Sequence, residues 1–268
     1  ETLSNPGGIV EDLAVRDGKL FVAMGPWGLA VLEAATLAET SRLRGNGVGG
    51  ASAIAWCGGR LCVARRGARG LSVVEPGWRR APEVVAEHLT DHGSQDIAVS
   101  GGRIFLAHGS AGVGVYHLAS PSALTHLETF QVPAPGSDGK GGGKQGGQKS
   151  GRIVSVAALE GRLLAAAQDS GKVYLYDLSA GRSLAAVIAL PGVGQLERVR
   201  FRGGQLWALS AHPEQASIYD VSAPSSPLLL GQVTSGAAEE FRAQYVGARR
   251  YSFGSNLVSV YRMEVMTP

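Results

Sequence analysis

The chain repeats one short pattern six times, and this repetition constrains the fold more than any other feature. An apolar residue precedes two turn residues, a polar residue and an apolar run, as in Val15–Val22 and Val99–Leu106. The second turn residue lies at positions 18, 59, 102, 161, 204 and 248, so the copies stand 41 to 44 residues apart except for one spacing of 59. A fixed period of this length indicates an array of equal structural units.

One low-complexity tract accounts for the long spacing. Residues 136–151 contain only Gly, Ser, Lys, Gln and Asp, and removing them restores the period. Such a composition cannot bury a core, so it predicts a solvated, flexible insertion between the third and fourth units. A natural loop and an engineered tether are both compatible with it. The whole chain, 1–268, is predicted to form one domain.

Each unit is predicted to hold four antiparallel strands. Turn pairs such as Asp17-Gly18 and Gly58-Gly59 favour two-residue hairpins. A third apolar strand follows, as at residues 28–32, and the Pro/Ser-rich turn at 222–227 leads to a fourth at 228–231. Four strands in a period of about 43 residues are typical of a propeller blade. The sequence therefore predicts an all-β, six-bladed β-propeller.

The two ends of the chain are expected to meet in one blade. The sixth copy stops soon after its third strand, whereas residues 1–6 precede the first strand of the first copy. We expect the N-terminal residues to complete the last blade and close the ring, which removes two open sheet edges.

The junction between third and fourth strands resembles a known family. Ile218–Pro224 reads I-Y-D-V-S-A-P, and Leu13–Ala23 reads L-A-V-R-D-G-K-L-F-V-A. Both segments resemble the repeat of LVIVD-repeat proteins, and the resemblance covers nearly the whole chain. It implies a propeller that is often secreted or surface-attached in bacteria, and it implies no particular activity.

Composition narrows the class of partner. The net charge of +3 comes largely from lysines in the insertion, so the body is nearly neutral and a nucleic-acid partner is not expected. No apolar run approaches the ~18 residues of a membrane span.

The source and location of the protein are inferred from composition and from the start of the chain. The excess of arginine over lysine, together with abundant alanine and glycine, suggests a GC-rich bacterial genome. The chain begins at Glu1, so we expect an export signal or envelope anchor to have been removed, and an extracytoplasmic location: periplasm, cell surface or secreted.

A ring of polar residues is predicted at the mouth of the central channel. They lie six to eight residues before the turn marker of their copy, and they are Glu11, Asp12, Gln95, Asp96, Glu197, Arg198, Glu240 and Arg242. Carboxylates beside arginines there can bind a polar ligand or a cation, or can simply neutralise one another at a hydrated entrance. The arginines argue against calcium.

No catalytic or cofactor motif accompanies this ring. His88 and His92 do not share a helix face, so no metal site is predicted, and His108 is expected at the surface. A Gly-x-Ser-x-Gly elbow and a P-loop are both absent from the sequence, and no cofactor is predicted. Cys57 and Cys62 flank a hairpin turn diagonally and are predicted to be free thiols, with a disulfide as the alternative in an oxidising compartment.

Four residues are candidates for surface contacts: Trp27, Arg65, Arg66 and Trp78. The tryptophans are placed in loops, and the arginines either form a solvated face or meet an anionic partner. We therefore expect a non-catalytic protein-interaction or ligand-binding scaffold of a bacterial envelope or surface assembly, with a protein as its partner. The alternatives are a channel-mouth hydrolase, lactonase or lyase, with or without a metal, and a carbohydrate-binding propeller.

Overall fold

The computed structural model describes all residues except 1, 5, 46, 67–69, 78–80, 121, 134–150, 180, 191, 194, 235–242, 247–248, 254–257 and 263–268. Every regular element in this part of the chain is a β-strand. The described residues include no helix long and apolar enough to cross a membrane. The all-β prediction is confirmed.

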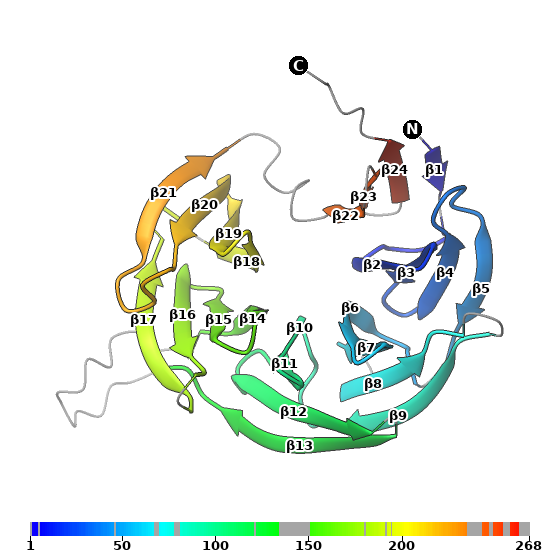
Figure 1. Cartoon of the computed structure of the whole chain (residues 1–268), viewed down its shortest axis with the longest axis horizontal. Helices are drawn as coiled ribbons and strands as arrows, with labels where there is room; N and C mark the ends of the chain where they lie inside the picture. Colours follow the sequence, from blue (N-terminus) through cyan, green and yellow to red (C-terminus); the bar gives the residue numbers. More distant parts are fainter. Residues whose placement is uncertain are drawn as a thin grey trace.

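Five sheets are each built from four strands that are consecutive in the chain, and they stand side by side around a central axis (Figure 1). Blade 1 holds β2 (Asp12–Arg16), β3 (Lys19–Ala23), β4 (Leu29–Glu33) and β5 (Glu39–Leu43), and blade 2 holds β6 (Ala51–Cys57), β7 (Arg60–Arg65), β8 (Gly70–Glu75) and β9 (Glu83–Leu89). Blade 3 holds β10 (Ile97–Ser100), β11 (Arg103–Ala107), β12 (Val113–Ser120) and β13 (Ala123–Phe130), and blade 4 holds β14 (Ile153–Leu159), β15 (Leu163–Gln168), β16 (Lys172–Asp177) and β17 (Ser183–Ala189). Blade 5 holds β18 (Gln195–Arg202), β19 (Gln205–His212), β20 (Glu214–Asp220) and β21 (Leu228–Val233).

The remaining four-stranded sheet is composite. It has the order β1 (Thr2–Ser4), β24 (Val258–Arg262), β23 (Arg249–Phe253), β22 (Ala243–Val246), with β1 antiparallel to β24. The N-terminal strand therefore joins the C-terminal sheet, as predicted from the missing fourth strand of the last copy.

The hairpins form because glycine and aspartate accept the left-handed backbone that a two-residue turn needs. The φ angles are 47° and 75° at Asp17 and Gly18, and 58° and 87° at Gly58 and Gly59. The strands on either side of each turn are apolar and buried, which places the core between the blades rather than inside any one of them.

Shared hydrophobic clusters join the blades in succession. Separate clusters link blade 1 to blade 2, blade 2 to blade 3, blade 3 to blade 4 and blade 4 to blade 5, and another links the composite sheet to blade 1. On its other face, blade 5 carries only the small cluster of Leu209, Ala216 and Trp207 among the described residues. The prediction of six equivalent blades is thus only partly met, because the structure supports five regular blades and one composite sheet.

The outer strand of every regular blade carries a β-bulge at the equivalent place. The extra residue of each bulge falls between two partners that are adjacent in the third strand, and these residues are Thr40, Val85, Leu127, Ala185 and Leu230. A bulge bends and twists its strand, which makes an outer edge a poor template for another strand.

Two sequence predictions concern local covalent and loop structure. Cys57 and Cys62 form a disulfide with a Cα–Cα distance of 5.9 Å, so the prediction of free thiols is wrong. The expected pairing of Cys57 with Arg60 is present, but the twist of a tight hairpin brings the diagonal pair within the usual 4.4–6.8 Å for bridged cysteines. Apart from Gly151, the predicted insertion at 136–151 lies outside the described residues.

Candidate functional site

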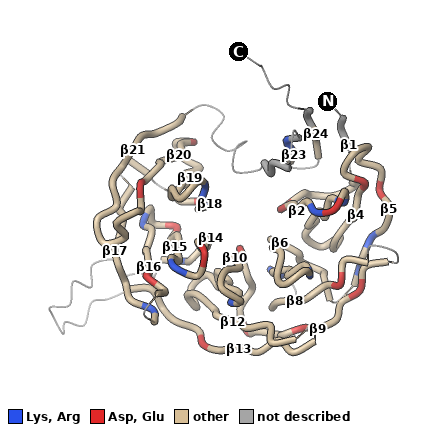
Figure 2. Tube along the Cα trace, in the orientation of Figure 1, with Lys and Arg blue, Asp and Glu red and all other residues tan. Residues whose placement is uncertain are grey.

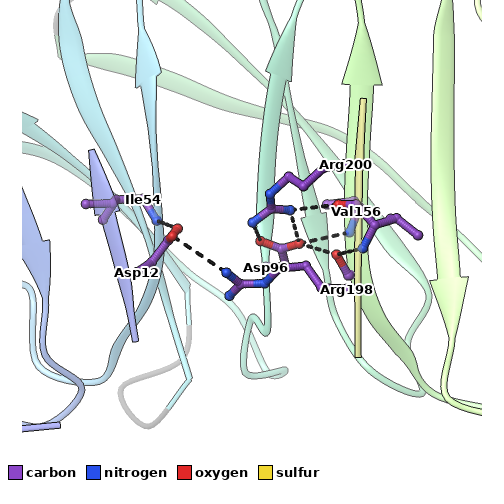
Figure 3. A network of polar contacts seen from close by, with 8 residues as sticks. Asp12, Ile54, Asp96, Val156, Arg198 and Arg200 are labelled. Carbon is purple, nitrogen blue, oxygen red and sulfur yellow. Dashed lines mark hydrogen bonds and ion pairs between the residues drawn. The ribbon is translucent and has the colours of Figure 1, made fainter. Parts of the chain in front are cut away.

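One repeated hydrogen bond links neighbouring blades around the axis. In blades 1, 3 and 4, a side-chain oxygen near the start of the innermost strand accepts a hydrogen bond from a backbone N–H of the next blade. Asp12 accepts from Ile54 at 3.0 Å, Asp96 from Val156 at 3.2 Å, and Ser155 from Val199 at 3.1 Å (Figure 3). These acceptors occupy the same position of the repeat, six residues before the turn marker. Asp12 and Asp96 of the predicted ring therefore tie blade 1 to blade 2 and blade 3 to blade 4, and Ser155 ties blade 4 to blade 5.

Two arginines of β18 neutralise the two aspartates. Arg200 donates to both carboxylate oxygens of Asp96, with N–O distances of 3.0 and 3.4 Å, and also to the carbonyl of Val199 at 2.9 Å. Arg198 lies 3.8 Å from Asp12. Asp96 also accepts a short hydrogen bond from the Ser155 hydroxyl. Asp96 is thus fully occupied by partners within the protein.

Sequence analysis missed Arg200, although a signal for it was present. It lies two residues beyond the predicted Arg198 in the same strand, and residues two apart point to the same face of a sheet. Including the position two residues further along each innermost strand, which lies on the same face, would have included Arg200.

The two aspartates differ in their electrostatics. Burial raises the pKa of Asp12 above its usual value, since Arg198 and Arg200 offset the loss of hydration only in part. Burial also acts against ionised Asp96, yet Arg200 and Arg198 together hold the pKa of Asp96 below its usual value. Burial likewise acts against the charge of Arg200, but Asp96 and Asp12 raise its pKa. Asp96 is the stronger electrostatic anchor of the pair.

A cavity of about 320 Å³ opens along the axis beside this network. Asp12 and Arg200 reach it between apolar and aromatic walls that include Trp56, Phe201 and Phe253. Because these charges already have partners, the arrangement fits a neutralised, hydrated centre rather than a ready ligand clamp. Among the described residues, no three His, Cys, Asp or Glu side chains are grouped to hold a metal ion.

The other predicted mouth residues lie in different surroundings. Glu11 lies 3.6 Å from Arg66, outside the aspartate–arginine cluster. Gln95 is half-buried and Glu197 is exposed. Glu240 and Arg242 lie outside the described residues.

The predicted surface residues divide in the same way. Trp27 is 42% exposed and Arg66 is exposed, whereas Trp78 lies outside the described residues. Arg65 is fully buried and pairs with Glu87 at 3.2 Å, so its assignment to the surface is wrong. Its side chain continues the inward face of β7, two residues after the buried Val63.

The structure also assembles a group that sequence analysis did not recognise. His88, His92, His108 and His126 line one recess with Tyr116 at the junction of blades 2 and 3. His108 is buried, contrary to the expectation of a surface residue. Since the members come from separate strands and loops, their spacing in the sequence carries no signal of the group.

The outer strands of blades 4 and 5 differ from those of blades 1 to 3. β17 reads S-L-A-A-V-I-A and β21 reads L-L-L-G-Q-V, with no ionisable residue, whereas β5, β9 and β13 each carry glutamate. Figure 2 shows red positions on β5, β9 and β13 and a blue position on β5, while β21 is tan throughout. The exposed large apolar residues of β17 and β21 are Leu184, Val187, Leu228, Leu229, Leu230 and Val233. We call these six side chains the apolar rim.

Comparison with known proteins supports the fold. No family model matches the chain, and no curated protein sequence matches it. The β-propeller domain of Cps50 (Swd1) from Myceliophteria thermophila is similar over 98% of this chain and 89% of its own, with a TM-score of 0.70 at 13% identity. The computationally designed protein Ika8 is similar over 95% of this chain and 71% of its own, with a TM-score of 0.59 at 11% identity. At these identities the likeness shows a shared architecture alone, and on that basis the chain is a β-propeller of antiparallel four-stranded blades.

Proposed function

We propose that the protein is a non-catalytic interaction scaffold that binds a protein partner through the apolar rim. The observation that carries this proposal is the pair of neighbouring outer strands that lack charge and expose six apolar side chains. Large exposed apolar patches commonly mark interaction sites, and the cores of protein interfaces are depleted of charged residues. The partner is therefore a protein with an apolar, uncharged contact surface.

The energetics of the apolar rim favour a protein over a small ligand. Leu228 is 63% exposed, and Leu184, Val187 and Leu230 are each between 43% and 49% exposed. Covering the exposed part of one such side chain contributes on the order of 1 kcal/mol, so useful affinity requires several to be covered together. A surface spread over two strands meets that requirement only with a broad partner.

The central channel supports an enzymatic role less well. Its carboxylates are engaged by Ile54, Val156, Arg198 and Arg200, which leaves no evident base or nucleophile poised toward the cavity among the described residues. The alternative of a carbohydrate-binding propeller rests on loop tryptophans, of which only Trp27 is described and exposed.

A pair of matched variants tests the proposal. Leu230→Lys and Leu127→Lys place the same charge at the bulge of an outer strand, and the two leucines are 49% and 50% exposed. We expect Leu230→Lys, and independently Val187→Lys, to lower the affinity for a partner that is isolated from the native host, identified and purified. Leu127→Lys should bind like the unaltered protein.

Two measurements decide the outcome. Titration calorimetry with the purified partner should show at least a tenfold loss of affinity for Leu230→Lys, which corresponds to about 1.4 kcal/mol. Equal affinities for all the variants would contradict the proposal. Sedimentation velocity of the protein alone covers the remaining case, because a dimer that Leu230→Lys dissolves would assign the apolar rim to a second copy of this chain.

We further propose an extracytoplasmic location in a bacterial envelope or surface assembly, membership of the LVIVD-repeat family, and a role of the composite sheet as sixth blade. The Cys57–Cys62 disulfide supports the location, since disulfides persist in oxidising compartments. The period of the repeat and the cluster shared with blade 1 support the sixth blade. Fractionation of the native host, with thiol trapping of both cysteines, tests the location: a cytosolic protein with free thiols would exclude it.

A further inference from the structure

The recess between blades 2 and 3 concentrates four of the six histidines of the chain. It encloses about 230 Å³. The titratable groups that line it are His88 from β9, Asp91 and His92 from the loop that follows, His108 after β11, Tyr116 from β12 and His126 from β13. Thr90 and Thr129 add hydroxyl groups, so the recess is rich in hydrogen-bond donors.

The imidazoles are close enough to act as a unit. The rings of His88 and His126 belong to different blades and stack with centroids 5.7 Å apart and an interplanar angle of 22°. The His92 and His108 centroids are 6.4 Å apart, and both His88 and His126 contact Tyr116, with ring centroids 5.2 and 5.0 Å away. At these distances, the positive charge on one protonated ring disfavours protonation of the others through electrostatic repulsion.

The innermost histidine is held in place by the fold. His108 Nε2 lies 3.1 Å from the Tyr116 hydroxyl, and His108 Nδ1 lies 3.3 Å from the Ser94 hydroxyl. Room for the ring depends on Gly114, because a Cβ atom there would lie 2.4 Å from His108 Nε2. The recess thus has a fixed polar floor and more exposed histidines at its rim.

Two glutamates on the strands that form the recess are paired with arginines. Glu87 of β9 pairs with Arg65, and Glu128 of β13 pairs with Arg182. Asp91 is the only acidic residue among the described residues that line it, and it is exposed. When several imidazoles take up protons, the recess therefore gains positive charge with little compensation.

We propose that this histidine recess is a proton-dependent binding site for a small oxyanion of the phosphate or carboxylate class. Histidine is the side chain that gains a proton as the pH falls below neutral, and protonated rings this close repel one another. Burial lowers the pKa of His108 to about 4, so this innermost ring stays a neutral hydrogen-bonding group and the positive charge is carried at the mouth of the recess. An oxyanion relieves that repulsion and accepts hydrogen bonds from imidazolium and hydroxyl donors, so binding takes up protons. Burial, and after it the nearby His126, lower the pKa of His88 and favour its neutral ring, so an anion that pairs with the charged ring is bound together with a proton. This site is on other blades than the apolar rim, and the two proposals can fail separately.

Thermal unfolding of the full chain provides the test, with EDTA present so that metal ions do not contribute. Inorganic phosphate and succinate are each compared with sodium chloride at equal ionic strength, at pH 5.5 and pH 7.5. At pH 5.5 we expect at least one oxyanion, at ten times its Kd, to raise Tm by roughly 3 °C, and we expect a much smaller rise at pH 7.5. Calorimetry in buffers of different ionisation enthalpy should show proton uptake on binding.

Variants assign the effect to the recess. His88→Gln and His126→Gln change partly exposed residues and should each abolish the oxyanion-dependent rise. His117→Gln is the matched control, because His117 is an exposed strand histidine outside the recess. The proposal is overturned if neither oxyanion stabilises the protein at pH 5.5, if the rise is equal at both pH values, or if His88→Gln and His126→Gln retain it.

Discussion

At the residue scale, two aspartates at equivalent positions of one network differ in the direction of their pKa shifts. Asp12 and Asp96 occupy the same position of the repeat and both cap the next blade, yet burial raises the pKa of Asp12 while Arg200 and Arg198 lower the pKa of Asp96. The alignment of the repeat predicted that both aspartates face the axis. It did not predict their opposite shifts, which depend on the three-dimensional distances to two arginines.

Replacement by asparagine separates these roles. Asp96→Asn leaves Arg200 without its carboxylate partner and should cost about 3 kcal/mol of unfolding free energy. Asp12→Asn keeps an oxygen for the N–H of Ile54 and removes a buried charge, so it should cost clearly less. Urea denaturation at pH 7 measures both values, and equal costs would contradict the difference between the aspartates.

His108 should make the fold sensitive to acid. Burial, followed by the neighbouring histidines, lowers its pKa to about 4, whereas an unfolded histidine has a pKa near 6.5. The folded state thus holds a neutral ring while the unfolded state takes up a proton, so stability is complete above pH 6.5 and falls as the pH drops toward 4. The loss approaches roughly 3 kcal/mol by linkage.

Unfolding free energies at pH 7 and pH 4.5, in chloride buffers, measure this loss. His108→Gln lacks the titrating ring, so its stability should change less between the two pH values, even if it is lower throughout. A variant with the same pH dependence as the unaltered protein would assign the acid sensitivity to other groups.

At the element scale, the hairpins and the presence of a fourth strand were predictable, whereas the bulges of the fourth strands were not. Asp-Gly and Gly-Gly pairs specify a turn locally, so the first two strands of each blade followed from the sequence. The bulges at Thr40, Val85, Leu127, Ala185 and Leu230 have no sequence motif in common, because they arise from how the fourth strand follows the twist of the third. The histidine recess was missed for a related reason: it exists only where two blades meet.

The disulfide of the β6–β7 hairpin should stabilise blade 2. It closes a short loop, so its reduction should lower the unfolding free energy by roughly 2 kcal/mol. Thermal unfolding with and without reductant measures the change. The Cys57→Ala/Cys62→Ala variant is the control, because its Tm should not respond to reductant.

At the scale of the whole molecule, the period predicted a propeller and the position of the N-terminal strand. It overstated the equivalence of the units, since blade 5 and the composite sheet share no hydrophobic cluster among the described residues, unlike the other neighbouring pairs. The degenerate sixth copy at 245–252 was the sign of this in the sequence.

Removal of residues 1–5 tests the contribution of β1. The deletion exposes the edge of β24 that now pairs through Thr2, Leu3 and Ser4, so the composite sheet becomes a three-stranded sheet. We expect a lower Tm and faster proteolysis of the segment after residue 243. Addition of a peptide with the sequence of residues 1–6 should restore part of the lost Tm, and an unchanged Tm after the deletion would show that β1 contributes no stability.

The kinked outer strands have a consequence for crowded solutions. In the five regular blades, the bulge interrupts the even spacing of backbone N–H and C=O groups along the outer strand. Two molecules that meet at these edges therefore cannot form a continuous intermolecular β-sheet. Encounters then depend on side chains alone. The exposed apolar side chains of blades 4 and 5 are tolerable under that condition, because contacts made through them stay reversible and do not extend into fibrils.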